Sequence, residues 1–165
     1  PAGSTAEQLI KACGGMAEGH HFKAYLPGGA SGGILPASKA DIPLDFGGKL
    51  AEEGCFVGSH AIVILSQLDN MWQVAHNLLS FFRHESCGQC TPCRTGTDKA
   101  VQEMSKSQPD TDRLMLLSQI MADASICGLG QAASNPLISV MKHFPEEVGT
   151  EAVTEQQNVG KHDKR

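Results

Sequence analysis

The chain has 165 residues, of which 41% are apolar and 19% charged, and its formal net charge is −5. This composition is ordinary for a soluble globular protein of one or two small domains. The acidic balance argues against nucleic acid and anionic lipid as partners, and every apolar run is too short for membrane insertion. No signal-peptide pattern is present, and a first residue of Pro1 rather than Met indicates a fragment or a processed product.

The first third of the chain predicts mixed α/β structure. Ser4 to Glu7 fits a capping box that opens a helix, which should stop at Gly14. Short strands are predicted at residues 21–26, 56–57 and 61–65. The Gly/Pro-rich passage between the first two should be irregular. Its segment 27–35 does not fit a phosphate-binding loop, because it lacks G-x-G-x-x-G and a following Lys-Ser/Thr pair.

Beyond Ser66 the pattern becomes helical. Apolar residues recur at helical spacing in four stretches, near residues 69–82, 97–104, 114–124 and 137–144. Pro109-Asp110 introduces the third stretch, and Asn135-Pro136 fits an N-cap with a first-turn proline before the fourth. Four amphipathic helices with short links favour a small bundle. The chain therefore divides into residues 1–66, residues 67–147 and a polar tail, 148–165.

Four cysteines carry the chemical signal. Cys87, Cys90 and Cys93 form C-x-x-C-x-x-C, and Cys127 follows with 33 residues between it and Cys93. Cysteine thiolates are the usual ligands of four-iron, four-sulfur clusters, and close spacing lets one loop hold three corners of the cube. Two helices of about a dozen residues, each about 18 Å long, would go out and return Cys127 to Cys93.

The neighbouring residues suit such a cluster. Gly88 and Gly128 permit a close approach of backbone to sulfide, and Pro92 stiffens the loop. Backbone N–H groups and the start of the helix after Arg94 would offset the negative charge of the cluster, with Arg94 and Lys99 as further candidates.

The residues leave alternatives open. Structural zinc is one of them, although zinc sites favour paired C-x-x-C knuckles or a Cys/His mixture. With zinc, the chain would be a non-redox interaction module. A separate alternative is a docking domain that recognises a partner subunit and in which the cysteines are incidental. Cys13 and Cys55 are predicted to be small buried hydrophobes, and His84 is predicted to be a surface residue or to lie behind the ligands. Bunched cysteines without a secretory signal indicate metal or redox chemistry in a reducing, cytoplasmic compartment.

The segments ESCGQCTPCR (85–94) and SICGLGQAA (125–133) resemble the family of NADH-binding flavoprotein subunits. Its members include the flavoprotein subunit of respiratory complex I, diaphorase subunits of NAD-reducing hydrogenases and beta subunits of NAD-dependent formate dehydrogenases. PGGASGGILPAS (27–38), ADIPLDF (40–46) and GCFVGSHAIVIL (54–65) are similar to the same family, so the resemblance covers residues 5–147.

The resemblance implies an α+β fold, with a β-grasp domain of the soluble-ligand-binding type followed by a four-helix bundle. It assigns Cys87, Cys90, Cys93 and Cys127 as ligands of one 4Fe-4S cluster, which receives electrons that pass from NADH through FMN. The implied partners are the FMN/NADH domain and the iron–sulfur and catalytic subunits of a dehydrogenase complex. No catalytic residue is expected in this chain.

Two departures from the family pattern matter. The glycine-rich segment that binds FMN and NADH in the family is missing here, so this chain alone is not expected to bind either cofactor. The interval between the third and fourth cysteines is shorter than in the complex I subunits. That interval favours the formate dehydrogenase or hydrogenase branch, and the segment SICGLGQAA favours formate dehydrogenase.

Overall fold

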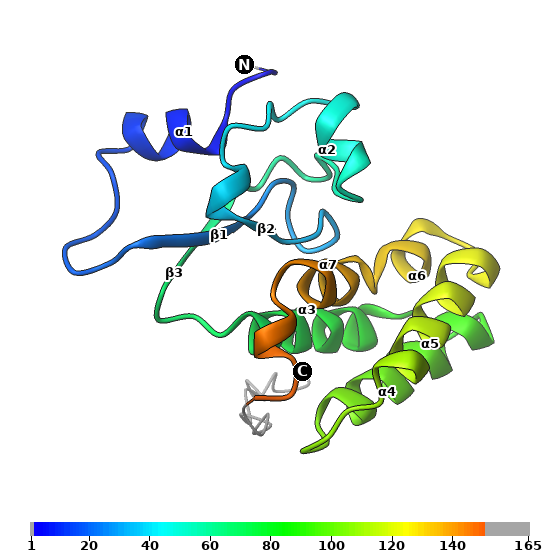
Figure 1. Ribbon diagram of the computed structural model, residues 1–165. Helices are drawn as coiled ribbons and strands as arrows, with labels where there is room; N and C mark the ends of the chain where they lie inside the picture. Colours follow the sequence, from blue (N-terminus) through cyan, green and yellow to red (C-terminus); the bar gives the residue numbers. More distant parts are fainter. Residues whose placement is uncertain (1, 151–165) are drawn as a thin grey trace, which may run out of the picture.

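The computed structural model describes residues 2–150 and shows a helix-rich chain with one small antiparallel sheet (Figure 1). The first part contains α1 (Ala6–Ala12), β1 (Phe22–Leu26), β2 (Leu35–Pro36), the 3-10 turn η1 (Ala37–Lys39), α2 (Gly48–Glu52) and β3 (Val63–Ser66). The second part contains α3 (Met71–Glu85), α4 (Thr91–Met104), α5 (Thr111–Ala124), α6 (Gly128–Ala132), α7 (Asn135–His143) and the 3-10 turn η2 (Pro145–Glu147). Most of the predicted polar tail, residues 151–165, lies outside the described residues.

The sheet has the strand order β2-β1-β3, and both neighbouring pairs are antiparallel. Tyr25 in the central strand lies opposite Leu35 of β2 and Ile64 of β3. Because side chains alternate along a strand, Tyr25 points to one face of the sheet and Ala24 and Leu26 point to the other. The strand predicted over 21–26 is confirmed, and the one predicted over 61–65 begins later, at Val63.

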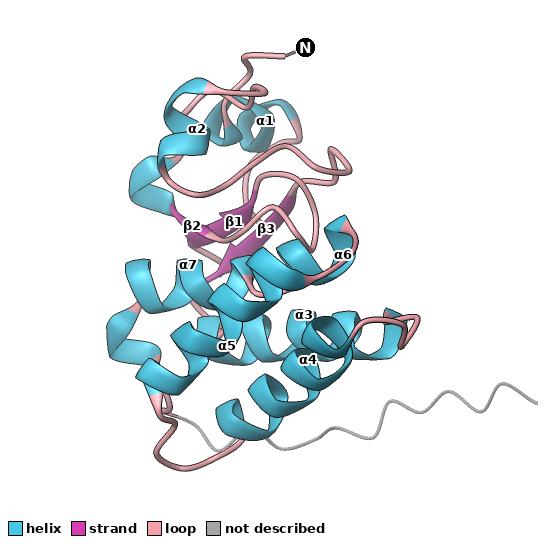
Figure 2. Ribbon diagram, turned by 90° about the vertical axis from the view of Figure 1, so that its right-hand side faces the viewer, coloured by secondary structure: helices cyan, strands magenta, loops and turns pink. Residues whose placement is uncertain are grey.

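An apolar core lies on each face of the sheet. Figure 2 shows the strands between α1 and α2 on one side and the α3–α7 helices on the other. Tyr25 belongs to the core under α1 and α2, together with the buried Leu50 and Cys55. Ala24 and Leu26 join the core of the helical part instead, which is centred on the fully buried Trp72. The sheet therefore joins both parts of the chain into continuous packing.

The four longer helices follow the periodicity of the sequence. Side chains cap the N-termini of two of these helices, as is usual for Asn and Asp at this position. At α3, Asn70 accepts a hydrogen bond from the Gln73 N–H, and at α5, Asp110 accepts one from the Arg113 N–H. The start of α7 differs by one residue from the prediction, because Ser134 is its N-cap and Asn135 its first residue. Among the described residues, no helix is long and apolar enough to cross a bilayer.

The capping box of α1 is displaced by one residue from the predicted Ser4/Glu7 pair. The Thr5 hydroxyl accepts from the Gln8 N–H, and the Gln8 side chain accepts from the Thr5 N–H. Ser4 is unable to start the helix because its carbonyl accepts the Leu44 N–H at 2.9 Å, which holds that segment extended.

The strand predicted at Phe56-Val57 is wrong. The Phe56 N–H donates to the Gly32 carbonyl, and the segment packs against the glycine-rich turn rather than along a strand. A Cβ at Gly32 would lie 2.7 Å from the Phe56 carbonyl oxygen, and one at Gly28 would overlap the same atom. The glycines of this segment therefore serve backbone-to-backbone packing, in agreement with the rejection of a phosphate loop.

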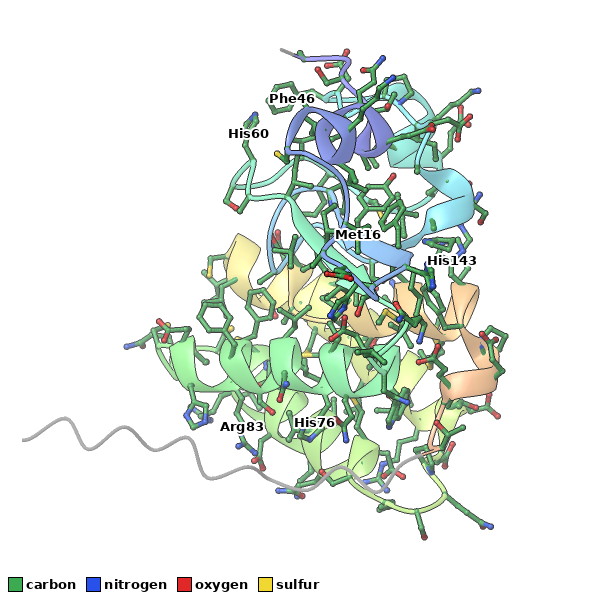
Figure 3. The ribbon with its side chains drawn as sticks, turned by 90° about the vertical axis from the view of Figure 1, so that its left-hand side faces the viewer. Met16, Phe46, His60, His76, Arg83 and His143 are labelled. Atoms are coloured by element: carbon green, nitrogen blue, oxygen red, sulfur yellow. The ribbon has the colours of Figure 1, made fainter. Side chains whose placement is uncertain are left out.

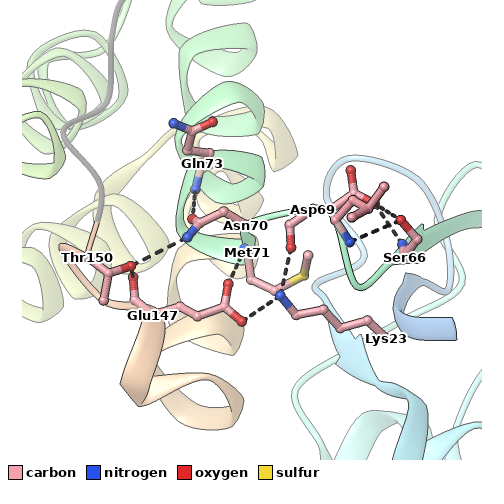
Figure 4. Close-up of polar contacts among 9 residues, drawn as sticks. Lys23, Ser66, Asp69, Asn70, Met71, Gln73, Glu147 and Thr150 are labelled. Carbon is pink, nitrogen blue, oxygen red and sulfur yellow. Dashed lines mark hydrogen bonds and ion pairs between the residues drawn. The ribbon is translucent and has the colours of Figure 1, made fainter. Parts of the chain in front are cut away.

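A polar clasp fastens the C-terminal end of the described chain to the sheet and to α3 (Figure 4). The Glu147 carboxylate pairs with Lys23 of β1 at 2.8 Å and accepts the Met71 N–H at 2.6 Å. Lys23 also donates to the Asp69 carbonyl. Glu147 thus satisfies a free N–H of the first turn of α3, where a negative charge is favourable.

A buried hydroxyl joins α7 to the loop before β2. Ser139 accepts from the Ile34 N–H at 2.8 Å and donates to the Pro136 carbonyl, and its side chain is almost completely buried. The Ser139 hydroxyl is therefore the hydrogen-bond acceptor of the Ile34 N–H.

We expect Ser139→Ala to lower the free energy of unfolding by about 1–3 kcal/mol, since the Ile34 N–H would remain buried without a partner. Ser118→Ala is the matched control. Ser118 is equally buried but bonds only to the Leu114 carbonyl of its own helix, so the loss there should be smaller. Urea titration of both variants measures the difference, and equal losses would contradict the role given to Ser139.

Glu53, directly after α2, binds two lysines from different elements. Its carboxylate contacts Lys39 of η1 at 2.5 Å and Lys142 of α7 at 3.0 Å, and His143 lies 3.6 Å away. The hydrogen bond from Lys39, followed by that from Lys142, lowers the pKa of Glu53 to about 2. Burial lowers the pKa of His143, so this imidazole is neutral near pH 7.

A carboxyl group whose pKa is depressed on folding stabilises the protein above its ordinary pKa and loses that contribution as the pH falls through the folded value. The stability advantage of the wild type over Glu53→Gln should therefore be complete near pH 6, and it should shrink between about pH 4.5 and pH 2. Thermal unfolding of both proteins across this range tests the expectation, and a difference independent of pH would refute it.

Candidate iron–sulfur site

The four cysteines of the predicted cluster site line one hollow of about 390 Å³ at the end of the helical part. Cys87 and Cys127 are exposed, Cys90 is half-buried and Cys93 is buried. The remaining lining residues are Glu85, Ser86, Gln89, Ile126 and Leu129. The structure thus brings together all four residues that the sequence grouped.

The loop between α3 and α4 positions the first three thiols. Ser86 ends α3 in an extended conformation, and its hydroxyl lies 3.3 Å from the Cys93 sulfur and accepts from the Gly88 N–H. Gly88 has a φ of 76°, a conformation that favours glycine, so the loop turns sharply after Cys87. Cys90 is the N-cap of α4, and Cys93 follows in its first turn.

The α4–α5 pair returns the chain to the site, as the predicted hairpin requires. The two helices have 14 residues each and pack closely. A Cβ at Gly96 would lie 2.5 Å from the Met121 side chain, so this glycine allows α5 to approach the first turns of α4. Cys127 follows the end of α5 as the N-cap of the short α6.

A second close contact seats α6 against the first turn of α4. A Cβ at Gly130 would lie 2.8 Å from the Cys93 Cβ and would overlap the Ser125 hydroxyl. The Gln131 side chain donates to the Ser125 carbonyl at 3.0 Å, which fixes the loop before Cys127. Gly130 is therefore the position at which the two cysteine-bearing segments meet.

Polar groups around Cys90 favour its thiolate. The Ile126 N–H, then the Cys93 N–H, lower the pKa of the Cys90 thiol, and the nearby Ser125 hydroxyl acts in the same direction. By distance and angle the Ser125 oxygen is buried without a hydrogen-bond partner of ordinary geometry among the described residues. Its nearest polar neighbour is thus the Cys90 sulfur.

These features fit an iron–sulfur cluster. The four thiols line one hollow, and a buried hydroxyl and N–H groups lie beside the Cys90 sulfur, where such groups tune a bound cluster. Within residues 2–150, no three His, Cys, Asp or Glu side chains converge closely enough to hold a single metal ion.

Other residues considered from the sequence lie elsewhere. Arg94 donates to the Gly88 carbonyl, so it braces the cysteine loop. Lys99 donates to Gln102 on the exposed side of α4. His84 is exposed at the end of α3, as expected. The structure confirms Cys55 as a buried hydrophobe, whereas the same prediction for Cys13 is wrong, because Cys13 is exposed just after α1.

Ser86, Ser125 and Gly130 were not singled out from the sequence. The serines each precede a cysteine closely, in Ser-Cys and Ser-Ile-Cys, which is a usable signal for hydroxyl groups near a sulfur. Gly130 carries no such signal, because its role depends on contact with α4.

Residues 73–151 match the NADH-ubiquinone oxidoreductase-F iron–sulfur binding region, a family whose name specifies a 4Fe-4S cluster. The F subunit of NADH-quinone oxidoreductase from Mycobacterium tuberculosis is 35% identical over 153 residues, which cover 89% of this chain and 34% of that protein. The HndC subunit of the NADP-reducing hydrogenase from Solidesulfovibrio fructosivorans is 37% identical over 150 residues, which cover 87% of this chain and 30% of that protein.

A similar fold occurs in the crystal structure of an NAD+-reducing NiFe-hydrogenase in its H2-reduced state. The TM-score is 0.77 at 27% sequence identity, and the match covers 90% of this chain and 26% of that one. This chain spans about a third of the length of its curated relatives. This chain is therefore similar to NADH-quinone oxidoreductase F subunits and to NAD(P)-reducing hydrogenase subunits, and its residues 73–151 match an iron–sulfur binding region.

Proposed function

We propose that this chain is the electron-relay part of an NAD-linked iron–sulfur flavoprotein dehydrogenase, in which Cys87, Cys90, Cys93 and Cys127 hold one 4Fe-4S cluster. The observation that carries the proposal is the single hollow lined by all four thiols, which come from segments on either side of the α4–α5 pair. The matched iron–sulfur binding region supports it. When bound, the cluster would supply one-electron transfer: a flavin that has accepted the two electrons of a hydride would pass them on one at a time.

Backbone N–H groups and serine hydroxyls would offset the negative charge of such a cluster, and no proton-transfer residue is needed beside it. The thiolates provide the ligands, and the Ile126 and Cys93 N–H groups already point at one of them. The Ser86 and Ser125 hydroxyls lie beside Cys93 and Cys90. N–H and O–H groups near sulfur are the means by which a protein tunes the potential of a cluster.

The exposed side of the hollow is the route by which electrons would enter or leave. Cys87 and Cys127 are exposed, and Ile126, which precedes Cys127, has 78% of its surface accessible. The buried side is closed by Cys93 and by α6. A neighbouring donor or acceptor would therefore approach over the 87 and 127 loops.

The parent enzyme is the finer part of the proposal. The short interval between Cys93 and Cys127 supports the formate dehydrogenase or hydrogenase branch, and the segment 125–133 supports a formate dehydrogenase beta subunit. The named relatives support a hydrogenase or NADH-quinone oxidoreductase subunit. In each case FMN and NAD(H) would bind to polypeptide outside this chain. Iron–sulfur and catalytic subunits would be its partners in a cytoplasmic complex.

The domain organisation belongs to the same proposal. The three-stranded sheet with α1 and α2 would be the β-grasp unit of the soluble-ligand-binding type, residues 1–66. The helices α3, α4, α5 and α7 would form the four-helix unit, residues 67–147, with α6 as the segment that seats the fourth cysteine.

Protein purified without oxygen should be brown and contain about four irons per chain, because the four thiols bind one cluster. Cys127→Ser should lose most of the iron and the visible absorption, whereas Cys13→Ser, at the exposed cysteine outside the hollow, should keep both. Metal analysis, absorption and low-temperature EPR of the reduced protein measure these properties. A colourless protein with one zinc per chain would overturn the redox function.

Gly130→Ala should lower the thermal midpoint by several degrees and reduce iron content, since the added Cβ has no room between Ser125 and Cys93. Gly128→Ala lies on the same short helix, and its added Cβ would have no atom within 4 Å apart from its chain neighbours and the backbone of its own helix. Its thermal midpoint should stay at the wild-type value. Equal destabilisation by both substitutions would show that the contact between α6 and α4 is unimportant.

A further inference from the structure

Two serine hydroxyls lie beside the two less exposed thiols of the cysteine hollow. The Ser86 oxygen lies 3.3 Å from the Cys93 sulfur, and the Ser125 hydroxyl lies beside the Cys90 sulfur. Of these two thiols, the first is buried and the second half-buried. Ser86 directly follows α3 and Ser125 directly follows α5, so the hydroxyls come from the two segments that flank the α4–α5 pair.

The contacts of Ser86 decide the direction in which its hydroxyl donates. Its oxygen accepts the Gly88 N–H at 3.3 Å, and its single proton is left for another acceptor. The Cys93 sulfur lies at hydrogen-bonding distance. Between a hydroxyl and a thiol either group can donate, but a thiolate that ligates iron carries no proton and only accepts. With a cluster bound, Ser86 is therefore the donor and Cys93 the acceptor.

The segment that carries Ser86 is anchored to α4 on both sides. Arg83 lies in the last turn of α3, where Figure 3 labels it, and pairs with Asp98 of α4 at 4.0 Å. After Ser86, the Gly88 carbonyl accepts a hydrogen bond from Arg94, which also belongs to α4. The hydroxyl therefore has a fixed position relative to the helix whose first turn carries the third cysteine.

Ser125 is fixed by its backbone and is almost completely buried. Its N–H donates to the Met121 carbonyl at 3.2 Å, and its carbonyl accepts from the Gln131 side chain at 3.0 Å. The residue is 6% exposed, and among residues 2–150 no group other than the Cys90 thiol is a partner of its hydroxyl. A Cβ at Gly130 would overlap the hydroxyl oxygen, so the glycine leaves room for it. The fold thus holds a buried hydroxyl against a second sulfur.

Given the proposed function, which places a 4Fe-4S cluster in the hollow, we propose that Ser86 and Ser125 donate hydrogen bonds to the sulfurs of Cys93 and Cys90 and thereby raise the reduction potential of that cluster. Uptake of one electron adds one negative charge at the iron, sulfide and thiolate atoms and requires no proton. A fixed O–H dipole directed at a thiolate becomes more favourable as that charge grows, so it stabilises the reduced form more than the oxidised form. Both serines are positioning residues, because they act through the ligating sulfurs.

A redox titration of protein purified without oxygen, followed by EPR, tests these two donor roles. In Ser86→Ala the equilibrium constant for reduction should fall about tenfold, which is about 59 mV for one electron. Ser125→Ala should shift the midpoint potential in the same direction. Ser86→Thr keeps the hydroxyl and should keep the wild-type potential. Ser118→Ala is the matched control, because this buried serine lies outside the hollow and bonds to the Leu114 carbonyl.

Iron content measured on the same samples separates failure of the donor roles from failure of the proposed function. An unchanged potential in an alanine variant with wild-type iron content would overturn the donor role of that serine and leave the iron–sulfur function intact. An equal shift in Ser118→Ala would assign the change to lost stability and would overturn both donor roles. A wild-type protein without a cluster would overturn the proposed function and, with it, the roles of Ser86 and Ser125.

A second measurement uses the wild-type protein alone, so it does not depend on variants that keep the cluster. Electron–nuclear double resonance of the reduced protein detects protons close to the cluster. A brief transfer to D2O should remove the couplings of the two hydroxyl protons, because O–H groups exchange faster than the hydrogen-bonded N–H groups of helices. Proton couplings that are unchanged after this brief exchange would show that no hydroxyl donates to the sulfurs.

Discussion

The geometry of the site depends on one constraint, the close return of α5 along α4. The two helices are equal in length, so a chain that leaves at Cys93 arrives back at the same end of the helical part. Two glycines make the return tight enough: Gly96 admits the side chain of Met121, and Gly130 lets α6 lie against Cys93. Without these contacts Cys127 would belong to a separate loop, and the hollow would have three thiols.

The electrostatics of the site come from short-range dipoles rather than from charged side chains. Arg94, the nearest cation in the sequence, uses its guanidinium to hold the Gly88 carbonyl, and Lys99 lies on the exposed side of α4. The groups beside the sulfurs are backbone N–H groups and serine hydroxyls. Such groups are fixed by the fold, so they offset negative charge without rearrangement and are little screened by salt.

The parts of the structure that depend on local pattern could be predicted from the sequence. The α3–α5 helices follow their apolar periodicity, and the cysteine spacing identified the four residues of the hollow. The features that were missed depend on contacts between distant segments. Phe56-Val57 has the composition of a strand but is bonded to a glycine turn, and the α1 cap moves to Thr5 because Leu44 binds Ser4. The need for a glycine at position 130 arises only from the contact with Cys93 of α4, so the local sequence does not reveal it.

The clasp at Glu147 has a consequence for the order in which the chain folds. Lys23 and Met71 emerge from the ribosome long before Glu147, so the first turn of α3 and the β1 side chain remain without their carboxylate partner until synthesis has passed residue 147. Contacts of such large sequence separation form late, since loop closure must precede them. The packing of the helical part is therefore completed only when its C-terminal end has been made. A nascent chain that stops between α7 and η2 would leave the first N–H of α3 without its carboxylate partner.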